Sequence, residues 1–141
     1  MIVKQADSQA EMKDAYSVRT KVFIHEQNVP AEEEIDQYEE EAKHFVLYDD
    51  HGSPIGAGRF RLVDGMGKVE RICVLSDVRS KGAGTMLMAA IHDEAKKQNI
   101  HELKLNAQNH AIPFYEKLGY QVVSEEFLDA GIPHHTMKMK I

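Results

Sequence analysis

The chain has 141 residues, 43% of them hydrophobic, and a formal net charge of −6 at pH 7. That length suits one compact domain with a single core, and because no Pro/Gly/Ser-rich linker divides the sequence we expect one domain over residues 1–141. The sequence contains neither the apolar h-region of a signal peptide nor the roughly 18 consecutive apolar residues of a membrane span, so we expect a soluble cytoplasmic protein that does not bind a membrane.

The negative charge is concentrated in one segment. Seven of the 23 acidic residues lie within residues 32–41, and the other 16 are balanced by 17 lysines and arginines. Binding of nucleic acid needs clustered positive charge, so we expect no nucleic-acid partner. The acidic segment has two interpretations: a solvated face without a specific role, or the border of an acceptor site that attracts a cationic amine.

The first half of the chain predicts a strand and a helix followed by three strands. Ser8 and Glu11 form a capping box, and the apolar periodicity that follows predicts a helix ending near Ile24. Pro30 biases Val29 away from helix and indicates a loop. Three β-type runs joined by tight turns then predict an antiparallel meander. The predicted strands of this half are residues 2–6, 43–48, 55–63 and 68–75.

The second half alternates helices and strands. Helical periodicity predicts a long helix over residues 82–98 and a short one over 111–118, which Gly119 is placed to end. The predicted strands of this half are residues 101–106, 120–127 and 135–140. This order of elements predicts an α+β domain with a mixed, mostly antiparallel sheet.

A glycine-containing loop over residues 79–84, Arg-Ser-Lys-Gly-Ala-Gly, leads into the long helix. A helix start carries unpaired N–H groups and partial positive charge, and glycines let an anion approach the backbone. The loop therefore predicts a bound phosphate or pyrophosphate. A P-loop needs its lysine after the glycines, and a dinucleotide fingerprint needs a small residue where Leu87 stands and an acidic residue where the next strand ends, at Asn106. Neither pattern fits.

The loop resembles the pyrophosphate loop of the GNAT superfamily of N-acetyltransferases, whose pattern is Arg/Gln-x-x-Gly-x-Gly/Ala after a strand. A second segment, residues 106–120, resembles the family's other signature, Asn-x-x-Ala-x-x-Phe/Leu-Tyr-x-x-x-Gly-Phe/Tyr. The two segments occur in the family's order and at about its spacing. The resemblance implies the GNAT fold, in which helices flank the sheet and the strands on either side of the long helix are parallel neighbours that splay apart around the pantetheine arm of acetyl-CoA.

The resemblance also implies which residues hold acetyl-CoA. The main chain of Cys73 and Val74 would bind the pantetheine amides and the thioester carbonyl, with the Val74 N–H as the oxyanion donor. Asn109 and Asn106 would hydrogen-bond the pantetheine arm, although either could instead be a turn or cap residue. Backbone N–H groups would hold the pyrophosphate at Arg79, Ser80, Lys81, Gly82, Ala83, Gly84 and Thr85.

Tyr115 matches the family tyrosine whose phenol lies near the cofactor sulfur, and a phenol with a pKa of about 10 is protonated at pH 7. We expect it to act as the general acid, the alternative being an aromatic packed beside Phe114. Glu70 is the candidate general base, because period-two alternation puts it on the strand before the loop and on the same face as Val74.

The alternative for Glu70 is a cross-strand ion pair with Arg59 or Arg61. His110 and Glu26 are further candidates for the base, and a base is unnecessary if the pKa of the acceptor amine is low. Cys73 is the only cysteine in the chain and lies in an apolar run, so we expect a packing residue. The adjacent His134 and His135 would point to opposite faces of a strand, and we expect no metal.

Together these features imply an acetyl-CoA-dependent N-acetyltransferase that acts on a primary amine, expected to belong to a small molecule, by direct attack through a tetrahedral intermediate. The alternative is a non-catalytic acyl-CoA-binding or sensor module on the same fold, which would need the loop but not Tyr115. A homodimer is compatible with the resemblance, but no apolar stripe in the sequence identifies a dimer surface.

Overall fold

The computed structural model describes residues 1–79 and 81–141. Within these residues one sheet holds all the strands, in the order β1-β2-β3-β4-β5-β8-β6, with β7 paired to β8 beside β6. Every pairing is antiparallel except that of β4 with β5, so the predicted mixed, mostly antiparallel sheet is confirmed. The strands are β1 (Ile2–Gln5), β2 (Lys43–Tyr48), β3 (Pro54–Val63), β4 (Met66–Val74), β5 (Glu102–Gln108), β6 (Gln121–Val122), β7 (Phe127–Asp129) and β8 (Ile132–Lys140).

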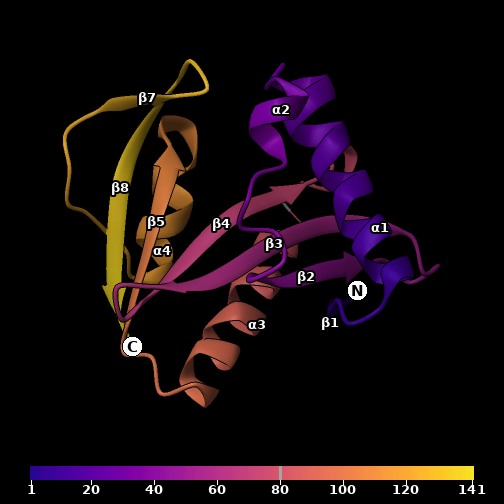
Figure 1. Ribbon diagram of the computed structural model, residues 1–141, viewed down its shortest axis with the longest axis horizontal. Coiled ribbons are helices and arrows are strands. Elements are labelled where there is room, and N and C mark those ends of the chain that lie inside the picture. Colours follow the sequence, from indigo (N-terminus) through magenta and orange to yellow (C-terminus); the bar gives the residue numbers. More distant parts are fainter. Residues whose placement is uncertain (80) are drawn as a thin grey trace.

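Helices cover both faces of the sheet (Figure 1). The helices are α1 (Gln9–Arg19), its π-helical continuation η1 (Thr20–Glu26), α2 (Ala31–Glu34), α3 (Ala83–Lys97) and α4 (Ile112–Leu118), with short 3₁₀ turns η2 (Ser76–Val78) and η3 (Asn109–Ala111). Alternation along β2 divides the core, because Phe45 and Leu47 pack with α3 and α4 while Val46 and Tyr48 pack with α1.

Most of the predicted elements are present, but α2 was not predicted, β8 begins three residues before its predicted start, and two further elements differ as follows. The capping box at Ser8 forms, with its hydroxyl accepting from the N–H of Glu11 at 3.1 Å, but the helix it opens continues past Ile24 as η1 to Glu26. The prediction of one strand over residues 120–127 is wrong. The N–H of Thr136 donates to the Ser124 hydroxyl at 2.8 Å instead of to a strand partner, and this side chain separates β6 from β7.

The parallel pair β4–β5 opens towards one end. The two strands pair only from Gly67 with Leu103 to Val69 with Leu105. Beyond that point β4 runs on to Val74 beside β3, and β5 runs on to Gln108 beside β8. The predicted splay between the strands on either side of α3 is therefore confirmed, and it leaves a gap in the middle of the sheet.

The described residues include no helix that combines the length and the apolar character needed to cross a membrane.

Candidate active site

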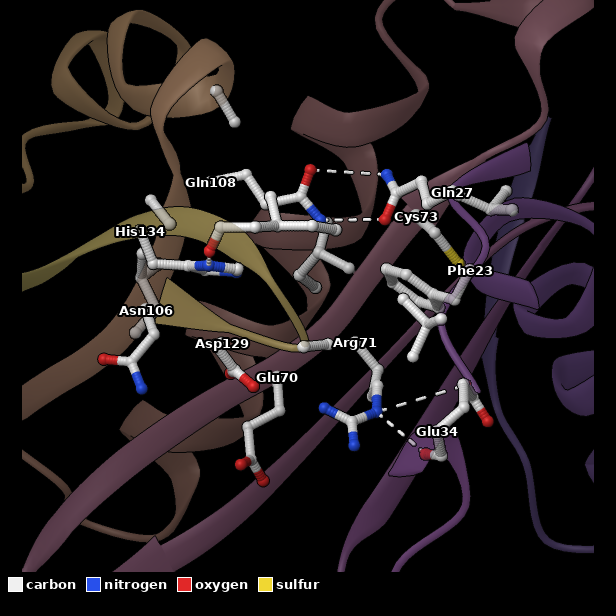
Figure 2. Close-up of a pocket in the computed structure, with 18 of the residues that line it drawn as sticks. Phe23, Gln27, Glu34, Glu70, Arg71, Cys73, Asn106, Gln108, Asp129 and His134 are labelled. Carbon is white, nitrogen blue, oxygen red and sulfur yellow. Dashed lines mark hydrogen bonds and ion pairs between the residues drawn. The ribbon is translucent and has the colours of Figure 1, made fainter. Parts of the chain in front are cut away.

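A cavity of about 570 Å³ lies where β4 and β5 separate. The C-terminal halves of these two strands form its floor, η1 and α2 close one side, and the turn between β7 and β8 closes the other. Figure 2 shows side chains from all of these elements pointing into the same space. The amides of Gln27 and Gln108 bridge the cavity through two hydrogen bonds, of 2.8 and 3.3 Å.

A β-bulge shapes the β4 wall. Arg71 has a φ of +58°, and the register between β3 and β4 shifts at this point. As a result Val69, Ile72 and Val74 all pack on the α3 side of the sheet, although strict alternation would separate them. The prediction that Glu70 shares a face with Val74 is therefore wrong, because the extra residue of the bulge reverses the alternation between them.

Tyr115 extends from α4 into the cavity wall and is only 8% exposed. Its ring packs edge-on against Phe114 and Tyr120, with centroid distances of 5.0 and 5.9 Å. Burial and the neighbouring Cys73 raise the pKa of Tyr115, so the phenol keeps its proton at neutral pH. Cys73 also lines the cavity, and burial raises the pKa of its thiol to about 12, which agrees with the packing role expected for it.

The loop before α3 has the geometry of an anion site. Gly82, the N-cap of α3, has a φ of +81°, and a Cβ added there would meet no atom within 4 Å. No side chain caps α3 and its first turn holds no acidic residue, so nothing in the described part of this loop competes for the free N–H groups. Gly84 packs closely on Phe114, because a Cβ added there would lie 3.1 Å from the ring and the ring would have to shift slightly. These features fit a diphosphate.

Of the described residues of this loop, Arg79 lines the cavity. Ala83 is buried, Lys81 and Thr85 are exposed, and Ser80 lies outside the described residues. The guanidinium of Arg79 donates to the carbonyl of Val74 at 3.0 Å and pairs with Glu26 from η1. The bond from Arg79 lowers the pKa of Glu26.

The two asparagines are separated by the fold. Asn106 lines the cavity, and its Oδ1 accepts from the Thr136 hydroxyl at 2.9 Å. Asn109 is exposed and does not line the cavity. Its amide instead donates to Glu126 at 2.7 Å, and its oxygen lies 2.8 Å from Nδ1 of His135.

Glu70 forms the ion pairs that were the alternative to a catalytic role. Its carboxylate lies 2.7 Å from Arg61, 3.0 Å from Arg59 and 3.4 Å from Lys68. Burial opposes ionisation of Glu70, but the bond from Arg61 and the charges of Arg59 and Lys68 outweigh it and lower the pKa of the carboxyl. Such a carboxylate is a weak proton acceptor at neutral pH.

An ion-pair cluster that the sequence did not predict supports the α1 side of the cavity. We call it the arginine cluster; it comprises the almost fully buried Arg19 and Arg59 with the carboxylates of Glu34, Asp36 and Glu39. Arg19 bonds Glu34 at 2.6 Å and Glu39 at 2.7 and 2.8 Å, and Arg59 bonds Asp36 at 2.7 and 2.8 Å. The acidic segment is therefore not a solvated face at these positions, because its carboxylates neutralise buried arginines.

The signal for this cluster was present in the sequence. Arg19 occupies a core position in the apolar period of α1, and Arg59 lies inside the apolar strand β3. A buried charge needs a partner of opposite sign, so two arginines at core positions could have been matched to the acidic segment. His44 lies beside them, with its Nε2 2.8 Å from the carbonyl of Glu39.

Among the described residues, no group of three or more histidine, cysteine or acidic side chains has the arrangement of a metal site.

Comparison with known proteins agrees with the fold. The family model described as "Acetyltransferase (GNAT) domain" matches residues 5–141. YjcF of Bacillus subtilis, named an uncharacterized N-acetyltransferase, is 54% identical over 133 residues, which are 94% of each chain. A solved structure from Lactobacillus plantarum superposes with a TM-score of 0.91 at 26% identity, covering 99% of this chain and 97% of that one.

The fold is also that of a GNAT family acetyltransferase from Elizabethkingia anophelis solved with acetyl-CoA bound, with a TM-score of 0.76 at 14% identity and coverage of 99% and 97%. The family match spans almost the whole chain, and the loop before α3 and the splayed strands agree with it. The chain belongs to the GNAT acetyltransferases, a family whose membership supports acyl-CoA-dependent acetyl transfer.

Proposed function

We propose that this protein transfers the acetyl group of acetyl-CoA to a primary amine of a small molecule. The observation that carries the proposal is that a single cavity is lined by three features: the end of β4, the buried phenol of Tyr115, and charged side chains on the α2 side, which are Glu33, Glu34 and Arg71. A donor thioester lying in the gap between β4 and β5 would meet the phenol on one side and an acceptor on the other. The volume of about 570 Å³ suits a small molecule.

The donor would be held mainly by backbone. The first-turn N–H groups of α3 and the loop from Arg79 to Thr85 would bind its diphosphate. The N–H of Leu75 donates to the carbonyl of Ile55 in β3 at 2.9 Å, so by strand alternation the N–H of Val74 points the opposite way, into the gap. It is our candidate for the oxyanion donor. Cys73 and Asn106 would border the pantetheine arm, as the family resemblance implies.

The transfer is a direct attack. The amine nitrogen forms a bond to the thioester carbonyl carbon, the oxyanion of the tetrahedral intermediate is stabilised by the Val74 N–H, and the carbon–sulfur bond then breaks. The leaving thiolate takes the Tyr115 proton and the product nitrogen loses one, giving an amide and free CoA. Tyr115 regains its proton from solvent. The role of Glu70 as a base stays a prediction, to be weighed against its three ion pairs.

The substitution Tyr115→Phe tests the proposal, with free-thiol release from acetyl-CoA measured across a panel of primary amines. Loss of a general acid lowers turnover by about 10²- to 10⁴-fold, while affinity for CoA should stay within about threefold. Tyr120→Phe is the matched control, because Tyr120 is a buried tyrosine of the same core that does not line the cavity and whose hydroxyl contacts His92 at 2.9 Å.

Three outcomes are distinct. Slow turnover of Tyr115→Phe with normal turnover of Tyr120→Phe supports the proposal. Equal turnover of both variants removes Tyr115 from the chemistry. If the wild-type protein binds acetyl-CoA but releases no thiol with any amine, the protein is the non-catalytic acyl-CoA-binding module and the proposed transfer is wrong.

A further inference from the structure

The charges lining the α2 side of the cavity are unequally neutralised. Among its acidic residues, Glu34 is bonded by Arg19 at 2.6 Å and is only 2% exposed. Glu70 is held by Arg59, Arg61 and Lys68. These two carboxylates face the cavity, but their charges are already matched by cations on the protein. They are poorly placed to attract a cationic amine.

Arg71 differs from the other cations near α2 because most of its hydrogen bonds go to main-chain carbonyls and not to carboxylates. Its Nε donates to the main-chain carbonyl of Glu34 at 3.1 Å, and its Nη2 donates to the carbonyl of Glu33 and to Asp36, both at 3.3 Å. Asp36 already accepts two shorter bonds from Arg59. The carboxylate of Glu34 is 4.0 Å from Arg71. Two carbonyls therefore fix the guanidinium in place, and the carboxylate nearest to it, that of Asp36, is shared with Arg59.

The remaining edge of this guanidinium is available to a ligand. Nη1 of Arg71 has no hydrogen-bond partner within residues 1–79 and 81–141, and the side chain is 23% exposed. The β-bulge at φ +58° turns Arg71 out of the strand alternation. Figure 2 shows its guanidinium with Glu34 on one side and Glu70 and Asp129 on the other. Burial, followed by the positive charges of Arg59 and Arg19, lowers the pKa of Arg71.

We propose that the acceptor amine carries a carboxylate and that Arg71 binds this carboxylate, holding the amine over the thioester. The inference rests on the proposed function and narrows its substrate class to amino acids and related amino carboxylates. A planar guanidinium edge matches a carboxylate, and charge-assisted bonds of this kind are strong. The carboxylate of Glu33, which lines the same cavity, disfavours a doubly charged phosphate at this place more than a singly charged carboxylate.

The test begins with the wild-type enzyme and needs no variant. α-, β- and γ-amino acids are each paired with the amine in which a methyl group replaces the carboxylate, and free-thiol release from acetyl-CoA is measured for both members. We expect at least one amino acid to exceed its partner in kcat/KM by about tenfold or more, since a hydrogen bond to a charged group distinguishes ligands by roughly 10- to 100-fold.

Arg71→Lys then assigns the preference to this side chain. It should reduce kcat/KM for the preferred amino acid by about tenfold and leave that for the methyl analogue within about twofold, because the charge remains while the planar fork is lost. Lys13→Gln, which removes one positive charge from the exposed face of α1 outside the cavity, should change neither value. Thermal melting of Arg71→Lys shows whether the bonds to the α2 carbonyls are still made.

A binding measurement complements the kinetics. The carboxylic acid that lacks the amino group of the preferred acceptor should inhibit wild-type enzyme competitively with the acceptor, and Arg71→Lys should be about tenfold less sensitive. Equal rates for both members of every pair overturn the inference and leave the proposed function intact. Acetyl-CoA binding without turnover of any amine overturns the proposed function itself.

Discussion

The two parts of the proposed site are built from different kinds of contact. The part proposed to bind the donor diphosphate, here called the donor end, is local: the loop before α3 and the first turn of that helix come from consecutive residues, and the groups they would use are main-chain N–H groups. The acceptor end is assembled from α1, α2, β3 and β4. Its contacts include ion pairs of Arg19 and Arg59 with residues 15 to 23 positions away, and bonds from Arg71 to main-chain carbonyls 37 and 38 positions away. One end depends on backbone conformation, and the other depends on matched charges.

This difference sets what a substitution can do at each end. A loop that presents backbone N–H groups tolerates a change of side chain, provided that the φ angle and the open space are kept. A buried ion pair does not tolerate the loss of one partner, because the other charge is left without solvent or counter-ion. The donor end should therefore lose function before stability, and the acceptor end should lose both together.

The largest expected effect is on stability at the acceptor end. Arg59→Met leaves the carboxylates of Asp36, Glu39 and Glu70 without their shared cation, and removal of one partner of a buried ion pair costs about 3–5 kcal/mol. Arg79→Met is the matched control, since Arg79 makes a similar two-bond contact with Glu26 but is 43% exposed. An exposed pair contributes about 0–1 kcal/mol. Urea unfolding of both variants measures the difference.

Equal losses in the two variants would show that burial does not distinguish these ion pairs. A large loss confined to Arg79→Met would contradict the account of the arginine cluster altogether. Glu39→Gln provides a second measurement, because Glu39 accepts bonds from Arg19 and also lies 2.9 Å from Arg59.

The donor end could be predicted from the sequence because its determinants are local. The start of α3 lies within one residue of the predicted start, Gly82 adopts the positive φ that suits a glycine, and Tyr115 lines the cavity. Asn109 is the exception. Its side chain bonds Glu126 and His135, which the chain brings to the end of β5 only after folding, and nothing within the motif reveals these partners.

The acceptor end could be predicted only in part. The ion pairs of Glu70 with Arg59 and Arg61 were foreseen as an alternative because cross-strand neighbours follow from the predicted meander. The bulge at Arg71 was not foreseen, because it is a property of the β3–β4 register and not of the residues on β4 alone. Without the bulge, alternation put Glu70 on the wrong face and gave no reason to single out Arg71.

The next largest effect concerns the donor end. Gly82→Ala and Gly52→Ala form a matched pair, because both glycines have a φ near +80° and neither added Cβ would meet an atom within 4 Å. Each should lose about 1 kcal/mol of stability from left-handed backbone strain. Only Gly82→Ala should weaken CoA binding, by about tenfold, because its methyl group occupies space that a diphosphate at the helix start would need. Calorimetric titration with CoA measures the affinity of each variant. Equal affinities of Gly82→Ala and Gly52→Ala would show that the diphosphate does not bind at the N-terminus of α3.

The last effect is a graded response of stability to pH, and its smallest part comes from His44. Burial opposes ionisation of Asp36 and Glu39, yet the bonds from Arg59 and Arg19 lower the pKa of each to about 2. The ordinary pKa values of Asp36 and Glu39 are 3.8 and 4.5. Below these pH values the two groups are protonated in the unfolded chain but still ionised in the folded protein, so the stability they contribute is lost as pH falls towards 2. Burial, aided by Arg19 and Arg59, also lowers the pKa of His44. On acidification this imidazole therefore begins to reduce stability at a higher pH than the two carboxylates do.

Protonation of His44 also lowers stability as pH falls, but over a higher pH range than protonation of Asp36 and Glu39. Above its ordinary pKa of 6.5 both states are neutral, and below it the unfolded chain is protonated first, so stability begins to fall near pH 6.5, by at most about 1.4 kcal/mol per pH unit. His44→Gln keeps a donor for the carbonyl of Glu39 but cannot be protonated. Urea unfolding between pH 8 and pH 5 should give a flatter profile for this variant, while both proteins lose stability below about pH 4.5. A profile of unchanged slope above pH 5 would mean that His44 is protonated as easily in the folded protein as in the unfolded chain, and that the arginines beside it exert no effect on its ionisation.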